Sequence, residues 1–93
     1  MIYEWDPAKG AANRRKHRVA FDEALTVFKD PFALTFDDPD HSLDERRFIT
    51  IGVSARQRVL FVAHADRRID RVRLISARRA TPSETHAYQE SRR

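Results

Sequence analysis

Three apolar-rich runs follow one another between residues 46 and 77, separated by turns of only a few residues. The runs are RRFITIGVS, VLFVAHA and RVRLISA, and the turns that link them are ARQR and DRRID. The first and third runs alternate in polarity, as strands with one buried face do, while the middle run is almost entirely apolar. Because such short links place consecutive strands side by side, this part of the chain predicts an antiparallel meander centred on VLFVAHA.

Two helices and a further strand are predicted before this meander. Asp6 is a good N-cap for a helix, and Pro7 falls at the first helical position, where its missing N–H costs nothing. The run VAFDEALTVF, residues 19–28, predicts a second and shorter helix. The run FALTF, residues 32–36, alternates as a half-buried strand does.

The sequence TPSE begins a closing helix that runs through Tyr88. Thr81 is its N-cap, Pro82 its first residue and Glu84 its third, which together make a capping box. We therefore predict one α+β domain over residues 1–93. Its elements are two N-terminal helices, a four-stranded antiparallel sheet and a C-terminal helix.

The composition predicts a cytoplasmic protein. The chain has no cysteine, so disulfides and thiolate metal sites are excluded, as suits a reducing compartment. The segment MIYEWDPAKG lacks the features of a signal peptide, and no apolar run approaches the length that crosses a bilayer. We expect no contact with a membrane.

Positive charge is concentrated in the second half of the chain. Residues 1–45 carry 6 basic and 10 acidic side chains, whereas residues 46–93 carry 12 basic and 4 acidic ones. Of the 18 basic residues, 15 are arginine, which suits bidentate recognition of phosphate or carboxylate. This pattern indicates nucleic acid or an acidic protein as the partner, although a solvated surface explains any single arginine equally well.

Several kinds of catalytic site are absent from the sequence. The four histidines are scattered without metal-ligand spacing, and the acidic run from Asp37 to Asp44 lacks the glycine and the spacing of a calcium loop. No serine lies in a GxSxG motif, and no glycine-rich phosphate loop is present. We predict no metal and no cofactor.

The remaining polar residues suit cleavage of RNA by its own 2′-OH. That reaction needs a base, an acid and a cation that holds the charge on the phosphorane. Lys16 and His17 end the first helix, where a purely structural interaction with the helix dipole is an equally good explanation. Glu45 and Arg47 lie two residues apart at the start of a predicted strand. They are either an acid–base group beside an arginine that binds phosphate, or an exposed ion pair that contributes little stability.

Alternation in RVRLISA separates charge from core. Arg71 and Arg73 share a face with Ile75, whereas Val72, Leu74 and Ser76 take the other face. If helices cover Val72 and Leu74, Arg73 faces the open side of the sheet.

The chain resembles the BrnT family of toxins from bacterial type II toxin–antitoxin pairs. The matching pieces run nearly from end to end. They are WDPAK…N…KH, FDEALTVFKDP, DDPDHS, ERRFITIG and RVRLISARRAT followed by a helix. The resemblance implies a RelE-like fold and a metal-independent endoribonuclease that blocks translation. It also implies a BrnA-type ribbon-helix-helix antitoxin that inactivates the toxin, and through which alone the pair would bind DNA and repress its operon.

The resemblance also supplies the candidate site residues. The catalytic candidates that it supplies are Lys16, His17, Glu45, Arg47, Arg73 and Arg78. Independently of the resemblance, the basic second half of the chain offers Arg67, Arg71 and Arg79 as further RNA-binding candidates. One departure is Arg18, which stands where the family usually has glycine after KH. A glycine there would close the first helix in a left-handed conformation, so Arg18 must adopt that conformation or the helix must end differently.

Two other functions remain open from the sequence alone. The first is a non-catalytic basic module that pairs with an antitoxin and contributes to operon repression, with the arginines as interface anchors. The second is a stand-alone DNA reader, but the sequence has no helix-turn-helix pattern and no basic helix rich in base-reading residues.

Overall fold

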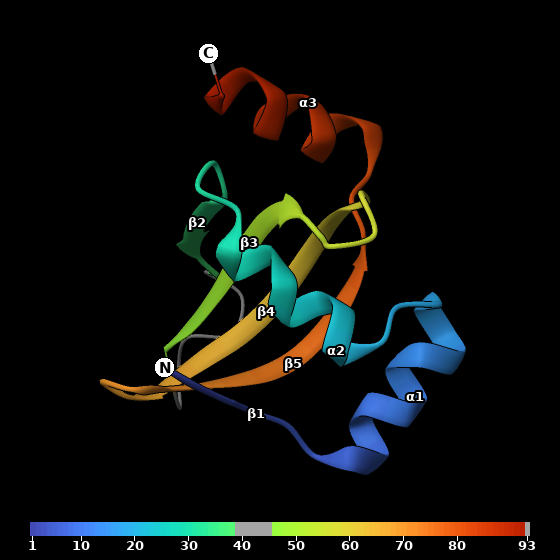
Figure 1. Cartoon of the computed structure of the whole chain (residues 1–93), viewed down its shortest axis with the longest axis vertical. Coiled ribbons are helices and arrows are strands. Elements are labelled where there is room, and N and C mark those ends of the chain that lie inside the picture. The colour runs from blue at the N-terminus through green and yellow to red at the C-terminus, as the bar shows by residue number, and fades with distance from the viewer. Residues whose placement is uncertain (39–45, 93) are drawn as a thin grey trace.

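A computed structural model describes residues 1–38 and 46–92. The protein is α+β, with five strands in one sheet in the order β1-β5-β4-β3-β2 (Figure 1). Along the chain the elements are β1 (Ile2–Glu4), α1 (Pro7–His17), α2 (Phe21–Ala24), the 3-10 helix η1 (Leu25–Lys29), β2 (Leu34–Asp37), β3 (Arg47–Val53), β4 (Val59–Arg68), β5 (Arg71–Arg79) and α3 (Pro82–Ser91).

The predicted four-stranded antiparallel sheet behind two N-terminal helices is wrong. The chain begins with β1, which pairs in parallel with β5 through Ile2–Arg71, Tyr3–Val72 and Glu4–Arg73. The sheet is therefore mixed, because the pairs β2–β3, β3–β4 and β4–β5 are antiparallel. A strand of three residues carries almost no alternation, and its partner lies nearly seventy residues away, so no local pattern indicates it.

One face of the sheet is covered by the N-terminal helices. Val19, Phe21 and Val27 pack there against strand residues that include Val62 and Leu74. The opposite face holds a smaller cluster around Ile49, Ile51, Ala63 and Tyr88, to which α3 contributes the tyrosine. Figure 1 shows α3 beyond one end of the sheet, so none of the helices within residues 1–38 and 46–92 lies over the part of this second face near the β4–β5 hairpin. We call this part the open face.

The alternation of β5 is interrupted at Ile75. Ala63 of β4 pairs with Ser76, whereas the next residue, His64, pairs with Leu74, so Ile75 is an extra residue in the ladder. As a result Ala77, and not the predicted Ser76, joins Val72 and Leu74 in the core under the helices. A one-residue bulge leaves no mark in a short alternating sequence, which is why the prediction failed beyond Leu74.

Helix α1 is fixed beside β5 by Asn13. The Asn13 side chain accepts a hydrogen bond from the Ala77 N–H at 3.0 Å and donates to the carbonyl oxygens of Ala77 and Val19, both at 2.9 Å. Because β1 covers only Arg71 to Arg73, this amide takes the place of a neighbouring strand further along the edge of β5.

Both predicted helix starts are formed. The Asp6 carboxylate accepts a hydrogen bond from the Ala8 N–H, and Thr81 and Glu84 make both bonds of the capping box. Arg18 settles the end of α1: it adopts the left-handed conformation with φ 61°, and its N–H donates to the Arg14 carbonyl. In the part of the chain that the structure describes, no helix is long and apolar enough to cross a membrane.

Candidate functional site

Arg47 and Arg73 lie on the open face of the sheet with Ala65 between them. Arg47 of β3 and Arg73 of β5 are both register partners of Ala65 on the central strand β4. Arg47 has the same strand parity as Ile49, and Ala65 the same parity as Ala63, so all three residues face away from α1 and α2. Ala65 is fully buried, and so are the Nε atoms of both arginines. The two long side chains therefore leave the sheet on the same side as the small alanine, which brings two guanidinium groups onto one face.

Two more arginines extend this surface toward the β4–β5 hairpin. Arg68 and Arg71 are register partners, and Arg71 lies two residues before Arg73 on the same face. We call Arg47, Arg68, Arg71 and Arg73 together the arginine face. Arg71 lies 3.5 Å from the Glu4 carboxylate, but both side chains are about two-fifths exposed, so this ion pair contributes little stability.

Arg78 lies at the other end of β5 and is already engaged. Its guanidinium donates to both carboxylate oxygens of Glu84, at 2.8 and 2.9 Å, and stacks 4.0 Å above the Phe61 ring. The hydrogen bonds from Arg78 lower the pKa of Glu84, whose carboxylate also completes the capping box. These contacts give Arg78 a structural role in joining β5 to α3.

Lys16 and His17 are remote from the arginine face. They end α1, and the carbonyl of the next residue, Arg18, accepts a hydrogen bond from Arg58, just before β4 begins. The start of β4 adjoins the last residue of β3, because Val53 pairs with Val59. Arg47 is at the opposite end of β3, six residues or about 20 Å away. The structure therefore does not bring the two halves of the predicted catalytic set together.

The remaining candidates fall in different places. Arg67 is the extra residue of a second bulge near the β4–β5 hairpin and is exposed. Arg79 is the partner of Leu60, a residue of the helix-covered core, so it projects from the face opposite Arg73. Glu45 lies outside the described residues.

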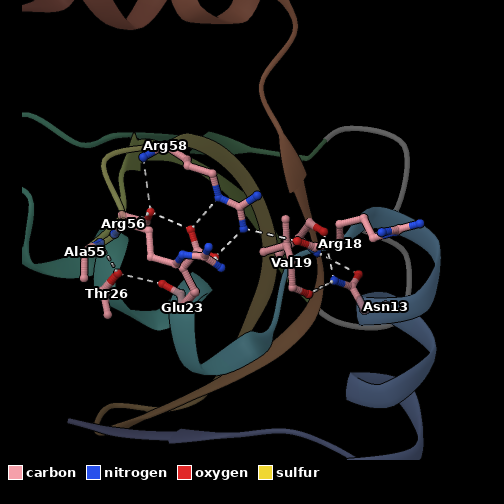
Figure 2. A network of polar contacts seen from close by, with 10 residues as sticks. Asn13, Arg18, Val19, Glu23, Thr26, Ala55, Arg56 and Arg58 are labelled. Carbon is pink, nitrogen blue, oxygen red and sulfur yellow. Dashed lines mark hydrogen bonds and ion pairs between the residues drawn. The ribbon is translucent and has the colours of Figure 1, made fainter.

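Sequence reasoning missed a polar network centred on Glu23 (Figure 2). The side chain of Glu23 is only 6% exposed, and its carboxylate accepts hydrogen bonds from Arg58 and from the Ser54 hydroxyl. The hydrogen bonds from Arg58 lower the pKa of Glu23 and outweigh the opposing effect of burial. Thr26 adds a bond from the Ala55 N–H at 2.8 Å. The network thus fixes residues 54–58 against α2, and no sequence motif indicates a contact between residues 35 apart.

A second missed feature is the hydrogen-bonded chain through His64. The His64 ring lies 2.8 Å from the Thr50 hydroxyl through Nε2 and 3.5 Å from the Asp66 carboxylate through Nδ1. Thr50 in turn lies 2.8 Å from the Thr35 hydroxyl. Burial lowers the pKa of His64, although Asp66 opposes this effect. The aromatic ring of Phe28 also packs edge-on against His64, so this histidine belongs to the core under the helices.

A cavity of about 480 Å³ lies between the end of α3 and residues 29–33. Asp30 accepts hydrogen bonds there from the Tyr88 hydroxyl and from the N–H groups of Val53 and Phe32. Burial and the bond to Asp30 raise the pKa of Tyr88 to about 12. Arg92 stacks over both Phe32 and Tyr88. These contacts fasten the closing helix to the sheet.

No group of three potential metal ligands occurs within residues 1–38 and 46–92. Among the described residues, the arginine face gathers several positive charges on one surface, which suits it to bind and stabilise negative charge.

Comparison with known proteins gives two matches. The family model described as "Ribonuclease toxin, BrnT, of type II toxin-antitoxin system" matches residues 5–84. A solved structure, that of the Brucella abortus ribonuclease toxin BrnT at 1.1 Å, superposes with a TM-score of 0.68. This superposition covers 87% of the present chain and 99% of the Brucella chain, at 21% sequence identity, which shows a shared fold. No curated protein matches the sequence.

Proposed function

Since this chain belongs to the BrnT family of ribonuclease toxins of type II toxin–antitoxin systems, we propose that it is a metal-independent endoribonuclease. We place its reacting phosphodiester on the arginine face. The observation that carries this proposal is the position of Arg47 and Arg73 on either side of Ala65, on a face that none of the described helices covers at this point.

Arg47 and Arg73 would stabilise the charge that develops during cleavage. The 2′-OH of the RNA loses its proton to a base and attacks the adjacent phosphorus, and the bond to the 5′-oxygen breaks as that oxygen is protonated. The products are a 2′,3′-cyclic phosphate and a free 5′-hydroxyl. Two guanidinium groups that hold the phosphorane oxygens would lower the activation barrier of cleavage. This electrostatic contribution would be larger than that of proton transfer, because the charges are already in place before the reaction. Such a mechanism needs no metal ion.

Glu45 is the better of the two proton acceptors that the sequence offers. His17 is separated from Arg47 by the length of β3, about 20 Å, so it cannot act on the same phosphodiester. Glu45 precedes Arg47 by two residues in the sequence. We therefore assign the transfer of the 2′-OH proton to Glu45, and no catalytic role to Lys16, His17 or Arg78.

The partner would be a BrnA-type ribbon-helix-helix antitoxin. Membership of a type II family implies an antitoxin that inactivates the toxin by binding to it. An acidic segment of that antitoxin would complement Arg71 and Arg73 and exclude RNA from them. The toxin itself would act in the cytoplasm, where its cleavage of RNA would inhibit translation, and DNA would be bound only through the antitoxin.

Cleavage of RNA in EDTA by the purified chain, freed of any antitoxin, tests the proposal. The parent protein should cleave, and Arg73→Ala should lose about 10²-fold in rate, as expected for one transition-state contact. Arg46→Gln is the matched control, because Arg46 lies beside Asp37 and over the Phe48 ring, away from Arg73. Intact RNA with the parent protein would instead identify a non-catalytic basic module, and an unchanged rate for a folded Arg73→Ala would remove the arginine face from the mechanism.

A further inference from the structure

A second basic surface lies at the end of the molecule opposite the arginine face. A groove of about 600 Å³ runs between α1 and residues 54–58, and it is lined by Ala11, Arg14, Arg15, Arg18 and Arg56. We call it the α1 groove. Four of its five lining residues are arginines, and Lys16 is exposed on the same helix.

The positive charge of the α1 groove is largely uncompensated. Within the described residues, Arg14, Arg15 and Arg18 form no ion pair. Arg56 lies 3.9 Å from the Glu23 carboxylate, but that carboxylate already accepts two hydrogen bonds from Arg58. Four cations on one groove, of which three have no ion pair among the described residues and the fourth shares its carboxylate, favour the binding of an anion with several charges.

The walls of the groove are fixed by the interactions described above (Figure 2). Asn13 fastens α1 to β5, and Glu23 fastens residues 54–58 to α2 through Ser54 and Arg58. Arg58 also donates to the Arg18 carbonyl and so joins the two walls directly. Because both walls are held, the backbone positions that carry the arginines are fixed before a ligand arrives, so binding has to order only the exposed side chains.

We propose that the α1 groove binds the phosphodiester backbone of an RNA strand at a distance from the cleavage site. Arginine also serves as an anchor in protein interfaces, but there it is usually accompanied by buried apolar or aromatic groups, and Ala11 is the one apolar residue among the described residues that line the groove. A surface that consists mainly of arginines suits phosphate groups, and contacts to phosphates do not depend on the base sequence of the nucleic acid. This inference rests on the proposed function, because it takes RNA as the ligand. The groove is separated from Arg47 by the length of β3, which is about 20 Å. Only an RNA of several nucleotides reaches both surfaces.

The test compares Arg14→Gln/Arg15→Gln with Lys9→Gln/Lys29→Gln, which removes the same charge from exposed positions outside the groove. Binding of a labelled single-stranded RNA of about 15 nucleotides is measured by fluorescence anisotropy across a range of salt concentrations. Loss of two phosphate contacts should weaken binding at least about tenfold at 0.1 M salt and reduce the slope of log K against log salt by about 1.4. The control should change the slope by less than about 0.5.

Cleavage separates this surface from the arginine face. The groove variant should raise KM for the long RNA and leave cleavage of a dinucleotide unchanged, because a dinucleotide cannot reach both surfaces. DNA of the same sequence as the long RNA should lose the same affinity in the variant, since the arginines contact phosphates.

Three results would overturn the inference. The first is that the groove variant and the control weaken RNA binding equally, and the second is that the groove variant loses affinity for RNA but not for DNA. The third is that the groove variant loses binding to polyglutamate while its RNA binding stays intact, which would identify an acidic protein as the ligand. If the parent binds RNA through the groove but cleaves none, the proposed function fails while this inference stands.

Discussion

Arg47 and Arg73 are both register partners of Ala65, one from each strand that flanks β4. Neither arginine is near the other in sequence, and each lies in a segment whose alternation also supplies core residues. The arrangement places two cations on one face of the sheet, with Ala65 between them in the register. In the proposed function, a single phosphate group on that face contacts both.

This relationship predicts that the two arginines act together in cleavage. Arg47→Ala and Arg73→Ala should each lose about 10²-fold in rate, because each removes one contact to the same developing charge. The cleavage rate of the double variant should fall by clearly less than the product of the two single losses. The reason is that removing either guanidinium already breaks the paired contact to the phosphorane. Single-turnover cleavage rates measure this, with urea unfolding to show that all variants are folded. Strictly multiplicative losses would mean that the arginines contact different groups.

The Glu23–Arg58 contact should be a major source of stability. Glu23→Gln leaves the guanidinium of Arg58, which is only 19% exposed, without its counter-charge, at a cost of about 3 kcal/mol. Arg56→Gln is the matched control: its side chain is 73% exposed and 3.9 Å from the same carboxylate, so the loss should stay below about 1 kcal/mol. Urea unfolding at pH 7 measures both, and similar losses for the two variants would contradict this reading of the network.

The middle and the end of the chain were predictable because their signals are local. Alternation located β3 and β5, a continuous apolar run located β4, and the capping box placed the start of α3 at Pro82. The N-terminal strand and the bulge at Ile75 were not predictable, because both depend on pairing between segments distant in sequence. Hydrogen bonds across the fold, such as that from Asn13 to Ala77, have no local pattern at all.

The candidate site was predictable only in part, for the same reason. The alternation of the strand correctly placed Arg73 and Leu74 on opposite faces of the sheet. Alternation within one strand does not indicate the distance between Lys16 and Arg47, which lie in different elements. Arg78 looked like a phosphate ligand because its partner, Glu84, was read only as a capping residue. Three of the arginines that line the α1 groove lie close together in the sequence, within RRKHR (residues 14–18). The sequence does not indicate that Arg56 lies beside them, because the fold brings it there.

His64 should make stability depend on pH below about 6.5. Burial lowers its pKa in the folded protein, so between that pKa and the unfolded value of 6.5 the unfolded chain binds more protons. The contribution of neutral His64 is thus complete above pH 6.5 and is lost as the pH falls. The urea midpoint should decline through this window in the parent and decline less in His64→Gln. An NMR titration that gives His64 a pKa above 6.5 would reverse the sign.

Arg18→Gly should stabilise the protein by about 1 kcal/mol. Arg18 has φ 61°, a conformation that costs a side chain with a Cβ atom but not glycine. Arg18→Ala is the control, because it removes the guanidinium and keeps the Cβ atom, so its stability should stay within about 0.5 kcal/mol of the parent. Thermal unfolding of the three proteins measures the difference. Equal gains for glycine and alanine would assign the effect to charge rather than to backbone strain.

The hydrogen bonds between Asn13 and Ala77 also determine where another polypeptide can extend the sheet. On the β5 side, β1 and then this side-chain amide occupy backbone groups that a docking strand would need. Among the described residues, the edge strand β2 (Leu34–Asp37) pairs with β3 alone and is mostly exposed. A partner that binds by strand addition would therefore be kept from β5 itself and would pair with an outer strand, either β2 or the three-residue β1.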